Sequence, residues 1–209
     1  MMANMEYNVP SERWPAHPET ATLEGKNKFI GFWTFLAGET ALFASLFATY
    51  LALKDSVPSD DHLLAADLFH LELAFVMTMF LLTSSLTSVY AVYHMRNNNF
   101  SKMQLWLGIT VLLGLGFLAL EIYEFIEYTH LGHTFRSSAF GSAFYFLIGT
   151  HGFHVCIGLV WITLLILRNA KRGLSVYTAA KVNTAALYWH FIDVVWVFIF
   201  TIVYLLGVM

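Results

Sequence analysis

The sequence contains little charge, one cysteine and few prolines, and each shortage excludes a class of protein. Charged residues make up 12% of its 209 residues, about half the usual fraction of a soluble globular domain. The single cysteine, Cys156, lies within an apolar block, which excludes a disulfide framework and a thiol-rich metal site. The net charge of −3, without a basic tail, argues against nucleic acid as a partner. All four prolines lie outside the long apolar runs: Pro10, Pro15, Pro18 and Pro58.

Long apolar runs are what the sequence has in quantity. Hydrophobic residues make up 58% of the chain, and crossing about 30 Å of hydrocarbon takes about 20 helical residues. Open sheets cannot lie in lipid, and closed barrels need shorter, alternating segments. We therefore predict an all-α fold, a polytopic membrane bundle of five transmembrane helices. The predicted spans are residues 29–53, 73–93, 103–126, 139–167 and 182–209.

The chain is predicted to consist of a short polar tail and one membrane domain. Residues 1–28 have no apolar core of the signal-peptide type, so we expect a tail over 1–28 and the bundle over 29–209. Nine of the eleven Lys and Arg residues lie in the tail and in the second and fourth loops, and the other two are Lys54 and Arg136. Because basic residues favour the cytoplasmic side, we expect the N-terminus in the cytoplasm and the C-terminus outside.

Several ionisable side chains lie inside the predicted spans. Each costs roughly 2.5–3.5 kcal/mol on insertion scales, which makes each a functional candidate. They are Glu39, Glu121, Glu124, His151, His154, His190 and Asp193. At about 1.5 Å per residue, four of these lie within about 5 Å of the midplane, whereas His190 lies about 9 Å toward the inside. The four are Glu39, His151, His154 and Asp193.

Glu39 is surrounded on its own helix by aromatic and apolar side chains, including Phe32, Phe35 and Phe43. Nothing on that helix can form a pair with it, so we expect a neutral acid or a hydrogen bond to another helix. Three roles stay open: a structural tie between two helices, a place beside a proton or lipid path, and metal ligation.

His151 and His154 are three residues apart, so they lie about 60° apart around one helix. They could form hydrogen bonds across a helix interface, or they could ligate a metal or haem. Because no carboxylate accompanies them on that helix, the metal signal is weak. We favour interhelical hydrogen bonds.

His190 and Asp193 begin a stripe that continues through Thr201 and Tyr204, so this face points into the bundle or at a partner subunit. The pair could be a proton relay or a satisfied structural contact. Glu121 and Glu124 could do acid–base work or hold a cation, or they could serve as capping or salt-bridge groups near the headgroups. The hydroxyls of the second span suit cross-helix hydrogen bonds: Thr78, Thr83, Ser84, Ser85, Thr87 and Ser88.

Four stretches carry a family resemblance. They are GFWTFLAGETALFASLFATY (31–50), LEIYEF (120–125), GTHGFHVCIGL (149–159) and YWHFIDVVWVFIFTIVYLLG (188–207). Together they resemble subunit III of the haem–copper terminal oxidases over residues 28–209. The Gram-positive cytochrome c oxidase type is the nearest, and quinol oxidase subunit III shares the core motifs.

The resemblance implies that this chain has no redox centre of its own. In that family subunits I and II hold the haems and coppers, so we expect no catalytic, cofactor-binding or metal-binding residue here. Subunit III supports assembly, phospholipid binding, proton uptake and durability of the catalytic subunit in the bacterial plasma membrane. The implied partners are subunits I and II, a small subunit IV and membrane lipids. The family's membrane glutamate matches Glu39.

The sequence departs from the mitochondrial pattern in one respect, and two other functions stay open. The chain lacks the first two of the seven helices of the mitochondrial pattern, so a lipid cleft lined by them must be built differently. An independent membrane haem protein would use His151, His154 and His190, whereas a small transporter would carry protons on Glu39 and Asp193. Against a transporter, the sequence shows no paired repeat and no proline-broken span.

Overall fold

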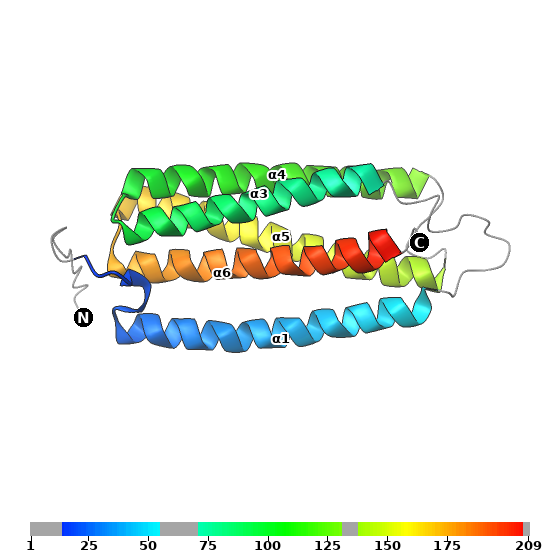
Figure 1. Ribbon diagram of the computed structural model, residues 1–209, viewed down its shortest axis with the longest axis horizontal. Coiled ribbons are helices and arrows are strands. Elements are labelled where there is room, and N and C mark those ends of the chain that lie inside the picture. The colour runs from blue at the N-terminus through cyan, green and yellow to red at the C-terminus, as the bar shows by residue number, and fades with distance from the viewer. Residues whose placement is uncertain (1–13, 55–70, 131–137, 207–209) are drawn as a thin grey trace.

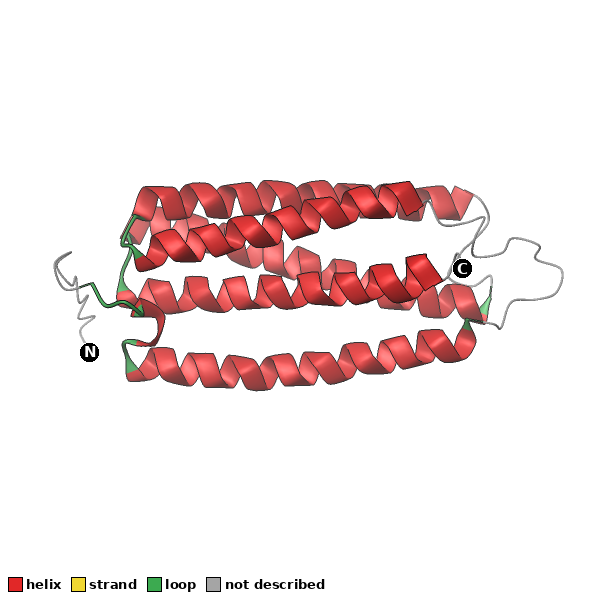
Figure 2. Ribbon diagram, viewed as in Figure 1, coloured by secondary structure: helices red, strands yellow, loops and turns green. Residues whose placement is uncertain are grey.

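The computed structural model describes residues 14–54, 71–130 and 138–206. Its long helices are α1 (Leu23–Leu53), α3 (Leu71–Arg96), α4 (Phe100–His130), α5 (Ala139–Arg172) and α6 (Val176–Ile199). A 3-10 turn, η2 (Pro18–Thr20), precedes α1, and the π-helical turn η3 (Phe200–Leu205) continues α6. The described residues contain no strand (Figure 2). Within these three ranges, five helices are long and apolar enough to cross a membrane, which confirms the predicted all-α fold.

The helices extend beyond the apolar runs from which they were predicted, because polar caps rather than hydropathy set their ends. The Thr22 hydroxyl accepts from the Gly25 N–H at 3.0 Å and begins α1. Ser138 caps α5 in the same way, and Ser175 caps α6. Gly173, with a φ of 72°, ends α5 and lets the chain reverse.

The helices lie roughly along one common axis (Figure 1). α3 and α4 lie side by side, α5 packs against α4, and α6 packs against both α3 and α5. α1 lies at the edge of the bundle, where it contacts α5 and α6. Four helices therefore form the core, and α1 is attached along one side.

Trp189 on α6 is the centre of this core and is 1% exposed. Glycines on two neighbouring helices make room for its ring: a Cβ at Gly114 of α4 would lie 2.7 Å from it, and one at Gly158 of α5 would lie 3.0 Å from it. The indole N–H donates to the hydroxyl of Ser84 at 2.9 Å. Small residues thus let three helices approach, which is how membrane helices gain packing energy.

Hydroxyl groups of α3 form a row of bonds to its neighbours. The Trp196 indole donates to Thr78 Oγ1 at 3.0 Å. Further along, Thr87 and Thr110 of α4 are joined at 2.8 Å between their hydroxyl oxygens. Since lipid offers no partner for an indole N–H, these acceptors fix the rotation of α6 against α3. The predicted cross-helix use of the α3 hydroxyls is confirmed at these positions.

The end of the bundle where α1 begins is closed by the segment before that helix. η2 packs against α6 and α1. Glu19 is 6% exposed and accepts a hydrogen bond from Arg96 Nη2 at 2.8 Å. Gly25 has no room for a side chain, because a Cβ there would meet the Glu19 carbonyl. The expected tail is therefore held on the bundle over at least part of its length.

Candidate functional site

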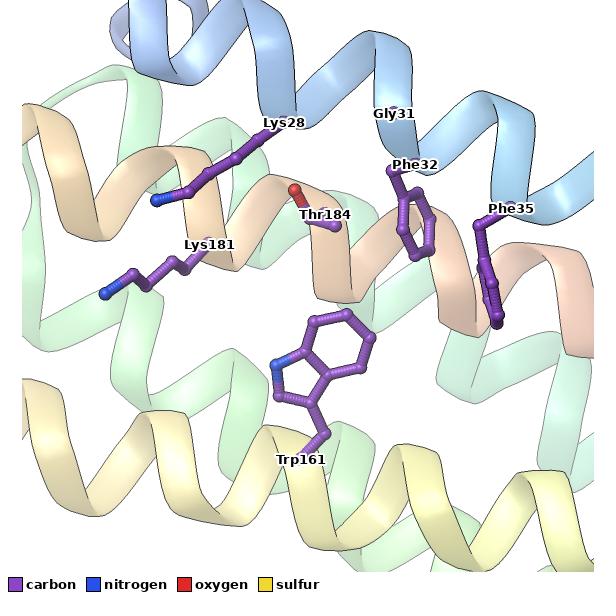
Figure 3. Close-up of a pocket in the computed structure, with 7 residues that line it drawn as sticks. All are labelled: Lys28, Gly31, Phe32, Phe35, Trp161, Lys181 and Thr184. Atoms are coloured by element: carbon purple, nitrogen blue, oxygen red, sulfur yellow. The ribbon is translucent and has the colours of Figure 1, made fainter.

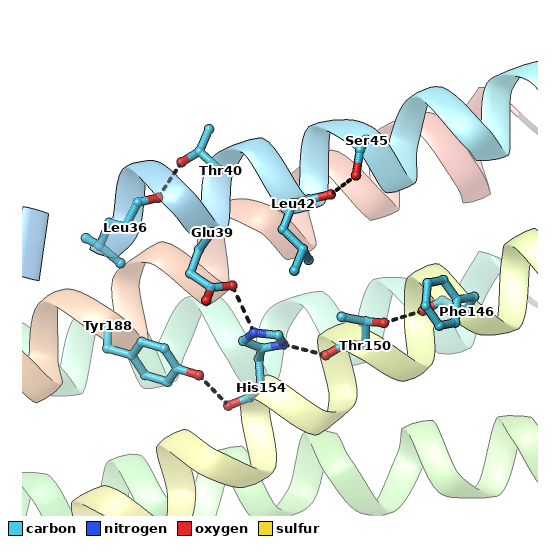
Figure 4. A network of polar contacts seen from close by, with 9 residues as sticks. All are labelled: Leu36, Glu39, Thr40, Leu42, Ser45, Phe146, Thr150, His154 and Tyr188. Carbon is cyan, nitrogen blue, oxygen red and sulfur yellow. Dashed lines mark hydrogen bonds and ion pairs between the residues drawn. The ribbon is translucent and has the colours of Figure 1, made fainter. Parts of the chain in front are cut away.

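Glu39 of α1 meets His154 of α5 at the boundary between the edge helix and the core. Glu39 Oε2 lies 3.1 Å from His154 Nε2 (Figure 4). Their side chains are 16% and 12% exposed, respectively, so the pair is nearly but not fully enclosed. The predicted hydrogen bond from Glu39 to another helix is thus present.

The other contacts of His154 fix the number of protons that this pair holds. Its Nδ1 lies 2.7 Å from the Thr150 carbonyl oxygen, which can only accept, so Nδ1 carries a proton. One further proton is then shared between Nε2 and the Glu39 carboxyl group. The pair is either acid and imidazole or carboxylate and imidazolium, and both forms are neutral overall. Neutrality lowers the cost of keeping the two groups in lipid.

Aromatic rings enclose the pair and leave it little contact with water. The Phe43 ring packs edge-on against His154, with 5.2 Å between ring centroids. The Tyr188 hydroxyl of α6 donates to the His154 carbonyl oxygen at 3.3 Å, as Figure 4 shows. The arrangement can hold one proton and move it between two side chains on different helices.

His151 faces the core rather than α1. Its Nε2 donates to the Ile192 carbonyl oxygen of α6 at 3.3 Å, and its ring packs against Phe117 and Trp196. The favoured interhelical hydrogen bonding is therefore found for both His151 and His154, but with different partners. Among the described residues, no three His, Cys, Asp or Glu side chains form a group that could hold a metal ion.

His190 is bound to α3, and Asp193 is buried beside it on α6. His190 Nδ1 lies 2.7 Å from the Ser85 hydroxyl oxygen. Asp193 is 6% exposed, and its Oδ1 is buried without a partner in the described residues. His190 lies midway along the apolar helix Val176–Leu205, which begins before the predicted residue 182. Its predicted depth in the membrane stays a prediction.

Glu121 and Glu124 of α4 are both buried, but their surroundings differ. Glu124 is 0% exposed and accepts hydrogen bonds from the hydroxyls of Tyr128, at 2.6 Å, and Tyr204, at 2.8 Å. Glu121 is 2% exposed, and neither carboxyl oxygen has a hydrogen-bond partner within the described part of the chain. Its carboxyl group lies over Gly152, where a Cβ would lie 2.8 Å from both oxygens.

A cavity of about 420 Å³ lies between α1, α5 and α6 (Figure 3). Its lining combines two ammonium groups with aromatic rings: Lys28, Gly31, Phe32, Phe35, Trp161, Lys181 and Thr184. The sequence interpretation missed this site. The sequence did hold one signal for it. Lys28 and Lys181 each lie near the start of a helix, α1 and α6, and these two helices begin at the same end of the bundle.

Comparisons with known proteins agree with the motifs of the first and last helices. Residues 16–208 match the family described as Cytochrome c oxidase subunit III. The chain is 66% identical to Cytochrome c oxidase subunit 3 of Bacillus sp. (strain PS3), over 97% of each chain. It is 67% identical to the protein of the same name in Bacillus subtilis (strain 168), over 94% of this chain and 95% of that one. Quinol oxidase subunit 3 of the same strain is 46% identical, over 88% and 89%.

Proposed function

The chain belongs to the cytochrome c oxidase subunit III family, and we propose that it is the accessory, non-redox subunit III of a proton-pumping haem–copper terminal oxidase. It is a multi-pass membrane protein and part of an oxidase complex. The higher identity to cytochrome c oxidase relatives than to quinol oxidase relatives favours cytochrome c as the electron donor. In this proposal subunits I and II hold the haems and coppers, and a small subunit IV is a further partner.

The Glu39–His154 pair is the observation that carries the proposal. It is the one place where the edge helix α1 and the core share a polar contact that could hold a mobile proton, among the contacts described above. Its partial exposure leaves the proton accessible to a polar group of a neighbouring subunit, while Phe43 and the other rings keep bulk water out. We assign it a supporting role in proton uptake and in the durability of the catalytic subunit. The histidines are bound to separate partners, which favours this role over shared haem ligation.

The lysine-rimmed cavity supports the binding of an anionic phospholipid. In Figure 3, Lys28 and Lys181 lie at one end of the cavity, with Phe32, Phe35 and Trp161 beyond them. Ammonium groups suit a lipid phosphate, and the rings suit the upper part of an acyl chain. Arg168 and Arg172 add positive charge near Lys181, and Glu24, which pairs with Lys28, offsets part of it.

The proposed orientation places this positive end in the cytoplasm. A cysteine at position 172 should then be protected from an impermeant thiol reagent in intact cells, and one at position 136 should react. Both variants need a Cys156→Ser background, since Cys156 is the native thiol. Labelling at 172 but not at 136 would invert the topology.

Co-purification tests the proposed function itself. A tagged chain should be extracted in mild detergent together with the other oxidase subunits, identified by their peptides, and the complex should show haem absorption. The chain separated from that complex should lack a Soret band. A Soret band that stays with the separated chain, or the absence of any oxidase subunit from the purified material, would contradict the proposal.

A further inference from the structure

One outward-facing stripe of α6 differs from the other lipid-facing surfaces. Its residues follow one another at spacings of three and four, and we refer to them as the α6 outer stripe: Asn183, Leu187, His190, Val194, Val197 and Thr201. Val194 is 53% exposed and Val197 is 41% exposed. α6 lies between α3 and α1 in Figure 1 and contacts both helices, so the stripe opens outward between them.

His190 gives the stripe an unsatisfied polar atom. Nδ1 of the ring is joined to Ser85, but Nε2 forms no hydrogen bond with the described residues and is not enclosed by the bundle. The ring lies at the centre of the apolar helix, where acyl chains can offer it no hydrogen bond. An imidazole nitrogen left in hydrocarbon would be costly.

Exposed threonines elsewhere on the surface do not create this problem. The Thr163 hydroxyl of α5 donates to the Leu159 carbonyl oxygen at 2.7 Å, within its own helix. Thr201, in the outer stripe, similarly bonds to the Val197 carbonyl oxygen at 2.8 Å. Such hydroxyls are compatible with lipid because their polarity is satisfied locally. The imidazole of His190 cannot turn back to its own helix for Nε2 while Nδ1 holds Ser85.

The bond to Ser85 determines what His190 still lacks. Nδ1 and the Ser85 hydroxyl share one hydrogen bond, so Nε2 is the ring nitrogen left to bond elsewhere. The missing partner is therefore a polar group outside the described part of the bundle.

We propose that the α6 outer stripe is the docking surface for a transmembrane helix of another oxidase subunit, which carries a polar side chain that forms a hydrogen bond with His190 Nε2. The exposed apolar side chains Val194, Val197 and Phe198 surround this position on α6 and would pack against that helix. The inference rests on the proposed function, because only that function places the chain among other oxidase subunits. It adds to that function the face used, the position of the polar contact along α6 and the polar chemistry of the partner.

Site-specific photocrosslinking in native membranes tests the docking face. A benzoylphenylalanine at position 194 or 197 should form an adduct with another oxidase subunit. The matched control positions, Leu112 of α4 and Val160 of α5, are 68% and 59% exposed on surfaces without an unpaired polar group described here. They should form adducts with lipid only. Adducts of 194 and 197 with lipid alone, or with a second copy of this chain, would overturn the proposal.

A pair of substitutions tests the hydrogen bond. His190→Leu should lower retention of the chain in the detergent-solubilised complex roughly 3- to 20-fold, the range of measured interhelical bonds in membranes. Thr163→Val, which removes a locally satisfied hydroxyl, should leave retention unchanged. Equal retention of all three proteins would contradict the bond. If the wild-type chain co-purifies with oxidase subunits but 194 does not crosslink to them, only this inference fails; if it co-purifies with none, the proposed function fails.

Discussion

α6 and α1 are both apolar transmembrane helices, but they are attached to the protein in different ways. Half of an apolar 18-residue stretch within Val176–Leu205 is buried in the bundle. Only 22% of the corresponding stretch of α1 is buried. The indole N–H groups of Trp189 and Trp196 bind α6 to hydroxyls of α3. α1 is joined to α5 through Glu39 and His154 and otherwise through aromatic contacts. Two apolar helices therefore take different places, α6 in the core and α1 at the edge.

The comparison separates polar groups that hold the fold from those placed for function. In the core, Glu124 and the tryptophans have fixed, buried partners and can exchange little with their surroundings. At the α1 boundary, a shared proton and a lysine-rimmed cavity lie within reach of the surface. Substitutions in the core should thus affect stability, and substitutions at the boundary should affect lipid content and turnover.

The largest effect is expected for Trp189→Ala. It removes a fully enclosed ring that fills the space left by Gly114 and Gly158, and should cost about 3–5 kcal/mol of unfolding free energy. Trp33→Ala on α1 is the control, because Trp33 is 52% exposed. Unfolding in mixed detergent, followed by circular dichroism, compares the two. Similar losses would show that α1 is packed as tightly as α6.

The two buried acids of α4 should respond in opposite ways to loss of the carboxyl group. Glu124→Leu leaves the hydroxyls of Tyr128 and Tyr204 without their shared acceptor and should destabilise by about 1–3 kcal/mol. Glu121→Leu removes a buried carboxyl group that has no partner in the described residues, and should be neutral or stabilising by about 1 kcal/mol. The same unfolding assay applies. A large loss in Glu121→Leu would mean that a bound water or ion satisfies that carboxyl group.

A smaller effect is expected at the cavity beside α1. Lys28→Gln and Lys181→Gln should each weaken anionic phospholipid binding by about 1 kcal/mol, roughly five-fold, without loss of the fold. Lipid extracted from the purified complex and quantified by mass spectrometry provides the measurement. Lys171→Gln is the charge-matched control, because Lys171 does not line the cavity. Equal lipid loss in all three variants would show that the net charge of the chain, and not the cavity, determines lipid binding.

The fold could be predicted from the sequence, because a helix that crosses lipid is recognised from the length and apolarity of its residues alone. The partner of Glu39 could not be predicted, since α1 is apolar on nearly every side and its sequence does not say which face meets the bundle. The depth calculation did place Glu39 and His154 in one layer, which their hydrogen bond confirms. The last helix begins at Val176 rather than at residue 182, because a polar helix start is invisible to hydropathy. Glu19 was missed altogether, since a buried acid outside the spans resembles an ordinary tail residue.

The central claim is that this chain supplies a proton-holding pair and no redox centre. Glu39→Gln tests it most directly, because the amide N–H can still donate to His154 Nε2 while the exchangeable carboxyl proton is lost. The haem spectrum and the oxygen consumption of the purified complex should be recorded through sustained turnover. We predict an unchanged spectrum and substantial initial activity, with weaker proton uptake or faster loss of activity than in the wild type. Loss of a haem or copper signal from an otherwise intact complex would contradict the account.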